Sequence, residues 1–270
     1  MKKTESTDSR SLKTFYLYVA VVVTIIIISL IIKGILIIQH SKFNSAHDFV
    51  LAVTQNNNVK EIIAFHPQVP AVAVLTIEDV KMSYPTLIRE YGITPDAYLQ
   101  VGNAADVNPD VTAFMWSSVL HTENWQSDLT IIDKVRLTLF AKSVTTNNKT
   151  NEAILLAAQA PQMDTTITNA LTDQDIADEN ITIQIINATD ISGFGQRLSR
   201  TLTNMGANVV EVSTAQNVQN KTTVQYYGDS SYTVNKIQKL LDVKPMSITR
   251  QPIANIIITL GTDEQKTKSF

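Results

Sequence analysis

The sequence predicts an α/β protein with a single N-terminal transmembrane helix, a reduced α/β domain and a C-terminal βαββαβ domain of the ferredoxin-like type. Three observations support this prediction: an apolar stretch at residues 15–38, short apolar runs between helical patterns after residue 45, and a regular strand–helix order from residue 181. We expect a short N-terminal segment at 1–14 and the transmembrane helix at 15–38. The reduced α/β domain is expected at 45–145, a polar linker at 146–180 and the C-terminal domain at 181–262. A chain of 270 residues is long enough for such an organisation.

The composition excludes several classes of protein and site. The chain has no cysteine, which rules out disulfides, iron–sulfur clusters, thiolate zinc sites and a cysteine nucleophile. Its four histidines are scattered without the spacing of metal ligands, so we expect no metal and no other cofactor. Neither a phosphate-binding glycine loop nor a common serine-nucleophile motif occurs.

The stretch 15–38 reads FYLYVAVVVTIIIISLIIKGILII. A helix needs about 20 apolar residues to cross a bilayer core. Tyr16 and Tyr18 lie where an interfacial aromatic belt is expected, and Lys33 is near enough to the far end for its side chain to reach water. A cleaved signal peptide would have a shorter apolar core and a small-residue cleavage site. We therefore expect a retained membrane anchor.

The orientation follows from the basic residues that flank the span. Lys42 alone follows it closely, whereas four precede it: Lys2, Lys3, Arg10 and Lys13. The positive-inside rule then places residues 1–14 in the cytoplasm and residues 41–270 outside the cytoplasmic membrane. Five of the 22 basic and two of the 25 acidic residues precede residue 41, so the exported part carries a net charge of −6. This charge disfavours direct binding to nucleic acid or to anionic lipid surfaces.

Residues 45–145 show mixed patterns. Phe49 and Val53, four apart, predict a helix over 45–56, and apolar runs predict strands at 60–65, 71–77 and 97–101. Helices are expected at 84–91, at 109–124 and after Ser127. The last of these has an apolar stripe that predicts its core side: Leu129, Ile132, Val135, Leu139 and Phe140.

Residues 146–180 are rich in Thr, Asn and Asp, which predicts a polar linker with one helical island at 153–160. The acidic residues near its end lack the glycine and the ligand spacing of a calcium-binding loop: Asp173, Asp175, Asp178 and Glu179. We expect them to be a solvated acidic stretch.

From residue 181 the pattern becomes regular. ITIQII, NVVEV and TTVQYY predict three strands, and MSITRQ and ANIIITLG predict the last two. Helices are expected at 194–205 and from Val234 to Leu241. Because the loop between NVVEV and TTVQYY is too short for a helical crossover, we expect these two strands to pair antiparallel. That pairing predicts the ferredoxin-like arrangement, with both helices on one face.

Tyr226 and Tyr227 are candidate binding residues. Neighbouring residues in a strand face opposite ways, so one ring is expected to be exposed for stacking on a sugar. Asn187 is a third candidate, since it begins a formal glycosylation sequon; the alternative is that its side chain bonds the turn after the strand.

Two further motifs have structural interpretations. Gly193-Phe194-Gly195 lacks the third glycine of a dinucleotide fingerprint, where Leu198 stands, and favours a tight turn with a helix close to the sheet. Glu78 and Asp79 form a carboxylate pair, but adjacent side chains in an extended segment point in opposite directions.

Residues 181–260 resemble the LytR C-terminal domain, a module found at the end of many LytR-CpsA-Psr cell-envelope proteins. Asn255 stands where the family often has Asp. The matching positions are Asn187-Ala188-Thr189, Gly193, Gly195, Gly206, Tyr226 and Leu260-Gly261.

The preceding segment is similar, more faintly, to a shortened LytR-CpsA-Psr catalytic domain, in VKEIIAFHPQVPAVAVLTIED, REYGITPDAYLQV and SDLTIIDKVRLTLF. Members of that family transfer a lipid-linked glycopolymer to peptidoglycan, with arginines on the pyrophosphate and acidic residues on a metal. Here Glu78-Asp79 occupies the arginine position, and Arg89 and Arg136 are the only arginines of residues 45–145. A diphosphate requires such cations, so the resemblance implies a degenerate domain.

The sequence thus favours a non-enzymatic accessory protein of a bacterial cell envelope that binds cell-wall polymer or a partner protein. The alternatives are a divergent phosphotransferase acting on lipid-linked glycopolymer, and a scaffold that oligomerises. No DNA-binding helix pair is expected, and the sequence leaves the oligomeric state open.

Overall fold

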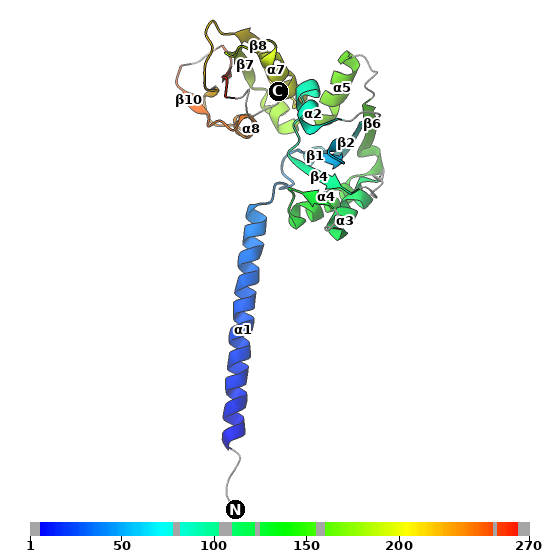
Figure 1. The fold of residues 1–270 in the computed structure, drawn as a ribbon, viewed down its shortest axis with the longest axis vertical. Coiled ribbons are helices and arrows are strands. Elements are labelled where there is room, and N and C mark those ends of the chain that lie inside the picture. The colour runs from blue at the N-terminus through cyan, green and yellow to red at the C-terminus, as the bar shows by residue number, and fades with distance from the viewer. Residues whose placement is uncertain are drawn as a thin grey trace, which may run out of the picture. The chain divides into compact units, whose positions relative to one another are not determined.

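The computed structural model describes residues 6–77, 82–102, 110–121, 125–154, 160–250 and 253–263. The chain forms two compact units, Met1–Ser41 and Lys42–Phe270. The first unit is helix α1 (Ser6–Gln39), in which Thr14–Leu36 is long and apolar enough to cross a membrane (Figure 1). One such helix near the N-terminus suggests single-pass membrane anchoring, as expected for residues 15–38.

Residues 42–171 of the second unit form what we call the first lobe, built on a six-stranded sheet of order β5-β4-β1-β2-β3-β6. β1, β2 and β3 pair antiparallel, whereas β4 and β6 pair parallel to β1 and β3. The strands are β1 (Phe49–Gln55), β2 (Asn58–His66), β3 (Ala71–Ile77), β4 (Ala97–Val101), β5 (Gln126–Ser127) and β6 (Lys149–Ile154).

Helices cover both faces of this sheet (Figure 1). On one face α3 (Val111–Leu120) and α4 (Ile131–Ser143) pack against a core that includes Leu51, Phe65 and Leu99. On the other face α2 (Tyr84–Tyr91) and α5 (Ala160–Leu171) enclose a second core around Ile62 and Leu75. A short 3-10 helix, Thr146–Asn148, precedes β6. The first lobe is therefore a three-layer α/β/α structure.

The helix expected over 45–56 is wrong, because Phe49–Gln55 forms strand β1. This strand lies between β2 and β4, and residues 51–53 are fully buried. A strand covered on both faces needs a nearly continuous apolar run rather than alternation. The four-residue spacing of Phe49 and Val53 fits that run as well as it fits a helix.

The structure also differs from the linker expected at 146–180. β6 extends the first sheet beside β3, and α5 buries Ile167, Ala170 and Leu171 in the core. α6 (Gln174–Glu179) inserts Ile176 into the core of the following lobe. A few apolar residues at helical spacing are enough to bury one side of each helix, while the many Thr, Asn and Asp residues take the other side.

Residues 174–263 form the second lobe, which confirms the alternation of strands and helices. Its sheet has the order β10-β9-β11-β7-β8. The elements after α6 are β7 (Thr182–Asn187), α7 (Phe194–Asn204), β8 (Asn208–Thr214), β9 (Thr223–Tyr227), α8 (Tyr232–Leu241), β10 (Met246–Ile248) and β11 (Ile256–Leu260).

The ferredoxin-like pairing of β8 with β9 does not form. β8 pairs parallel with β7, whereas β9 pairs antiparallel with β11 on the opposite side of the sheet. The intervening loop crosses the sheet end, since Ala215 N donates to Asn187 O, Gln219 N to Ala188 O and Thr262 N to Gln219 O. These bonds carry the chain past β7 and β11 before β9 begins, so a short loop joins two distant strands.

The corrected role of residues 146–180 makes a prediction about stability. Ile167 has no exposed surface, so Ile167→Ala should lower the free energy of unfolding of residues 42–270 by about 2–5 kcal/mol. Asn169→Ala, at an exposed position of the same helix, should change it by less than about 0.5 kcal/mol. Denaturant unfolding of both variants measures the difference. Equal stabilities would support the interpretation of residues 146–180 as a linker.

Candidate functional site

The two lobes meet through two groups of polar contacts, which together we call the seam. The first group joins α2, α5 and α7. Asn204, a buried residue of α7, donates from Nδ2 to Tyr91 O at 2.8 Å and accepts from Thr168 Oγ1 at 3.0 Å. Arg200 adds a pair with Asp164 in the same region. The last turn of α2 is thus capped by a side chain from the other lobe.

Gly92 allows this close approach. It ends α2 with φ of +62°, a left-handed conformation that glycine adopts without strain. A Cβ atom at this position would lie only 3.0 Å from the backbone nitrogen of Thr201 in α7. The glycine that ends α2 therefore also sets the contact between the lobes.

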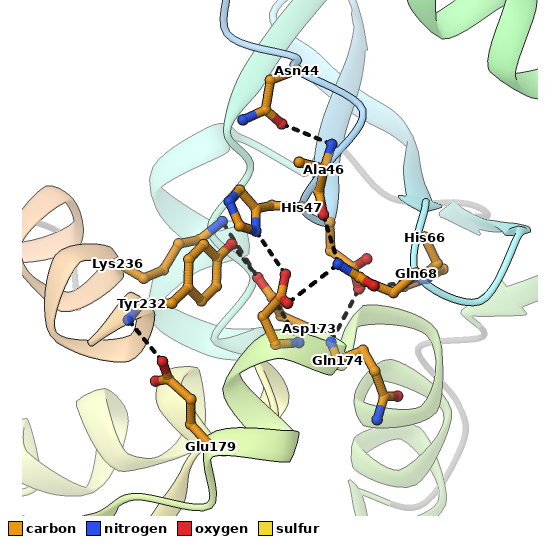
Figure 2. Close-up of polar contacts among 12 residues, drawn as sticks. Asn44, Ala46, His47, His66, Gln68, Asp173, Gln174, Glu179, Tyr232 and Lys236 are labelled. Carbon is orange, nitrogen blue, oxygen red and sulfur yellow. Dashed lines mark hydrogen bonds and ion pairs between the residues drawn. The ribbon is translucent and has the colours of Figure 1, made fainter.

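The second group centres on Asp173, where Figure 2 shows Tyr232 and Lys236 of α8 approaching from the second lobe. Tyr232 Oη donates to Asp173 Oδ2 at 2.8 Å, and Lys236 Nζ lies 3.8 Å from the same oxygen. Lys236 Nζ also donates to Asp96 Oδ1 at 3.0 Å. Glu179 fixes α8 by accepting from the backbone nitrogen of Tyr232 at 2.8 Å.

Two histidines of the first lobe complete this group. The His47 ring stacks on Tyr232 with a centroid distance of 4.4 Å, and its Nδ1 lies 2.7 Å from Asp175 Oδ2. His66 Nδ1 lies 2.7 Å from Asp48 Oδ2, and its Nε2 lies 3.0 Å from Ala170 O (Figure 2). The acidic stretch was expected to be solvated, but Asp173, Asp175 and Glu179 make hydrogen bonds in this group, and Asp173 is buried.

Burial and neighbouring charges act against each other in this group. Burial raises the pKa of Asp173, although Lys236 and the Tyr232 hydroxyl partly offset the effect. Burial alone would lower the pKa of Lys236, but the carboxylates of Asp96 and Asp173 outweigh it and raise that pKa. Burial and the nearby Asp173 raise the pKa of the Tyr232 hydroxyl. Lys236 is consequently charged at neutral pH and neutralises the surrounding carboxylates.

The seam holds the lobes rather than a ligand. Several of its donors and acceptors bind one another across the lobe boundary, among them Asn204 with Tyr91 O, His47 with Asp175 and Lys236 with Asp96. Within the residues that the structure describes, no group of three or more His, Asp or Glu side chains is arranged to hold a metal ion.

The arginines of the first lobe do not converge. Arg89 on α2 pairs with Glu90, whereas Arg136 on α4 donates to Phe43 O. These helices lie on opposite faces of the first sheet. The two residues therefore cannot clamp one diphosphate in this structure. The pair Glu78 and Asp79 lies outside the described residues.

Asn187 belongs to the turn after β7. Its side chain donates to Ile191 O at 2.9 Å and accepts from Thr189 N and Oγ1 at 3.1 and 2.7 Å. The residue is buried, so the structure places it in the turn and not on a contact surface. Gly193 has φ of +75°, and a Cβ on Gly195 would lie 3.1 Å from Val212 Cγ1, as the interpretation of a tight turn and close helix requires.

The two tyrosines of β9 separate as expected for a strand. Tyr226 packs partly buried against the core with the helices, while Tyr227 is 37% exposed on the opposite side of the sheet. Strand alternation and register place six other residues on the side of Tyr227, and we call this set the open face: Gln184, Ile186, Thr223, Gln225, Tyr227, Ile257 and Thr259.

The seven residues of the open face are uncharged and partly exposed, most of them carry amide or hydroxyl groups, and Glu211 on β8 lies beside them, paired with Gln184. α7 and α8 both pack on the other side of the sheet, through Leu198, Val234 and Ile237 among others. Sequence reasoning named Tyr226 and Tyr227 as a pair of which one ring would be exposed, but it missed the neighbours of Tyr227. The neighbours lie at alternate positions of β7, β9 and β11, a pattern that is visible in the sequence. Only the tertiary structure shows that these three strands lie side by side.

His66 makes the stability of the first lobe, next to the seam, dependent on pH. Burial opposes protonation of its ring, but the hydrogen bond and charge of Asp48, the Ala170 carbonyl and Asp173 raise its pKa above 6.5. The stabilisation by protonated His66 is therefore full below pH 6.5 and is lost as the pH rises through the raised pKa.

His66→Gln should then cost most stability in mildly acidic buffer, and the difference from the unaltered chain should shrink as the pH rises above 6.5. Urea unfolding at a series of pH values measures this difference. His121→Gln is the control, because among the described residues that exposed ring bonds Ser117 O, in the last turn of α3, and no carboxylate. A difference that stays constant or grows with pH would contradict the role of Asp48 as the partner.

The second lobe corresponds closely to a known domain. Residues 180–263 match the family model described as LytR cell envelope-related transcriptional attenuator. No curated protein matches the chain. The match covers the second lobe from the end of α6 onward. The second lobe therefore carries the match to this domain, which indicates a cell-envelope-related protein.

Proposed function

We propose that this protein is a non-enzymatic accessory of the cell envelope that binds cell-wall polymer through the open face of its second lobe. Its anchor α1 stays in the cytoplasmic membrane, the N-terminus lies in the cytoplasm, and residues 41–270 lie outside. The apolar helix, the basic residues before it and the domain match at residues 180–263 support this proposal.

The open face is the observation that carries the proposed activity. Tyr227 offers an exposed aromatic ring, which packs well on the apolar face of a sugar. Gln225 and Gln184 supply amide groups that both donate and accept hydrogen bonds, as sugar hydroxyls require. The nearby Glu211 accepts from Gln184 Nε2 at 2.9 Å and lies on the edge strand β8. A neutral glycan suits such a surface better than a polyanion does.

A partner protein of the envelope is the other candidate for the same surface. The seam favours either role, because it fixes the second lobe on the first and so presents the open face in one orientation. Peptidoglycan and a protein are separated by the binding measurement below.

Purified residues 42–270, a compact unit with its own cores, should co-sediment with insoluble peptidoglycan at low and moderate salt. Tyr227→Ala should weaken binding roughly two- to tenfold, the equivalent of about 0.5–1.5 kcal/mol for a lost aromatic contact. Tyr98→Ala, at a similarly exposed tyrosine on β4, should leave binding unchanged. No co-sedimentation of the unaltered fragment would exclude the polymer as ligand.

The proposed orientation can be measured with single cysteines, since the chain has none of its own. An impermeant maleimide should label Val218→Cys, an exposed loop position, in intact spheroplasts. Ser9→Cys, before the apolar stretch, should react only after the membrane is permeabilised. The reverse pattern of labelling would place the lobes in the cytoplasm.

A further inference from the structure

The outer surface of α3 and α4 carries apolar side chains where a water-facing helix normally carries polar ones. Trp116 and Leu120 lie four residues apart on α3, and Ile131, Val135 and Leu139 follow the same spacing on α4. Four of these side chains are highly exposed: Trp116 by 48%, Leu120 by 61%, Ile131 by 60% and Leu139 by 59%. We call these five residues the apolar ridge. Exposed apolar groups gathered in this way mark an interaction surface.

The ridge is not the core side of these helices. The side facing the sheet is formed by Phe114 and Met115 on α3 and by Leu137 and Ala141 on α4. Leu139, expected from the sequence to be part of the core stripe, points away from it. The helices therefore have apolar residues on both sides, and the first core accounts for only one of them.

Charged groups are scarce along the ridge. α3 has none, and on α4 Asp133 and Lys134 are buried while Arg136 is bonded to Phe43 O. Lys142, in the last turn of α4, is exposed beside the ridge. An apolar surface with a tryptophan and a flanking lysine is typical of a segment that lies in the interface of a bilayer.

The covalent connection limits how far the start of α4 can lie from the end of the apolar stretch. The backbone nitrogens of Lys42 and Phe43 each donate to Asp133 Oδ1 at 2.9 Å, in the first turn of α4. Only residues 37–41 separate Lys42 from the end of the apolar stretch at Leu36. Even a fully extended chain would span about 20 Å over this distance, and α1 continues as a helix to Gln39, which shortens it. α4 therefore begins within reach of the headgroup region in which the anchor ends.

We propose that the apolar ridge is a second membrane contact, which docks the first lobe on the surface of the bilayer that α1 spans. The bilayer is favoured over a soluble partner because the short tether gives it a high effective concentration. The net charge of −6 on residues 41–270 means that docking depends on the apolar side chains and not on attraction to anionic lipid. This inference depends on α1 remaining in the membrane, but it does not depend on the ligand of the open face.

The test uses the full chain in nanodiscs of phosphatidylethanolamine and phosphatidylglycerol that hold one copy each. Leu139→Cys provides a unique site for an environment-sensitive fluorophore, because the chain has no other cysteine. Val218→Cys is the matched control, since Val218 is 57% exposed on the second lobe. Elution of the protein with the discs shows independently that the anchor is inserted.

Emission from the label at residue 139 should shift to shorter wavelength, and lipids with a shallow spin label should quench it several-fold more than the label at residue 218. This difference should persist in about 0.5 M salt, which screens interactions between surface charges. Adding Trp116→Glu and Leu120→Glu should abolish the difference without lowering the melting temperature, because both side chains lie on the exposed surface.

Equal quenching of the two labels in discs that contain the inserted anchor would overturn the proposal. Protection of the label only in discs that hold two copies, without lipid quenching, would also overturn it and would assign the ridge to a contact between copies.

Discussion

The structure of the exported unit depends on the neutralisation of buried carboxylates between its lobes. Asp48 and Asp173 are withdrawn from water, which is unfavourable for a charged group unless a partner compensates it. Lys236 and Tyr232 on α8 and His66 on β2 provide that compensation. Lys236 also pairs with Asp96 of the first lobe, and the backbone nitrogen of Gln174 in the second lobe donates to Asp48, so separating the lobes would remove partners from these carboxylates. The seam therefore turns two sheets with independent cores into one body.

A single body gives the two proposed surfaces a fixed relation to each other. The apolar ridge belongs to α3 and α4 of the first lobe, and the open face belongs to the second sheet. One surface suits the interface of a bilayer and the other suits a neutral glycan. A protein that contacts both would hold wall material at a set position relative to the membrane, without any chemistry of its own. The degenerate catalytic resemblance of the first lobe stays a prediction.

Most elements of the fold could be predicted from the sequence, because their signals are local. α2 has its stop at Gly92, and the strands at 71–77 and 97–101 lie where their apolar runs predict them. β1 was mistaken for a helix, since an apolar run buried on both faces has no alternation. Strand alternation predicted that one ring of Tyr226 and Tyr227 would be exposed, and the structure shows that it is Tyr227. Asn187 was offered both as a contact residue and as part of a turn, and its side chain bonds the turn.

The sequence by itself determined the apolar span at 15–38, the alternation of strands and helices after residue 181, and the separation of Tyr226 from Tyr227. Each depends on periodicity within a few residues. Only the tertiary structure decided that β8 and β9 lie at opposite sides of their sheet, that α5 and α6 each contribute to a core, and that Lys236 meets Asp96. Those outcomes depend on which distant segments pair, and the free energy of such pairing comes from burial that no single segment contains.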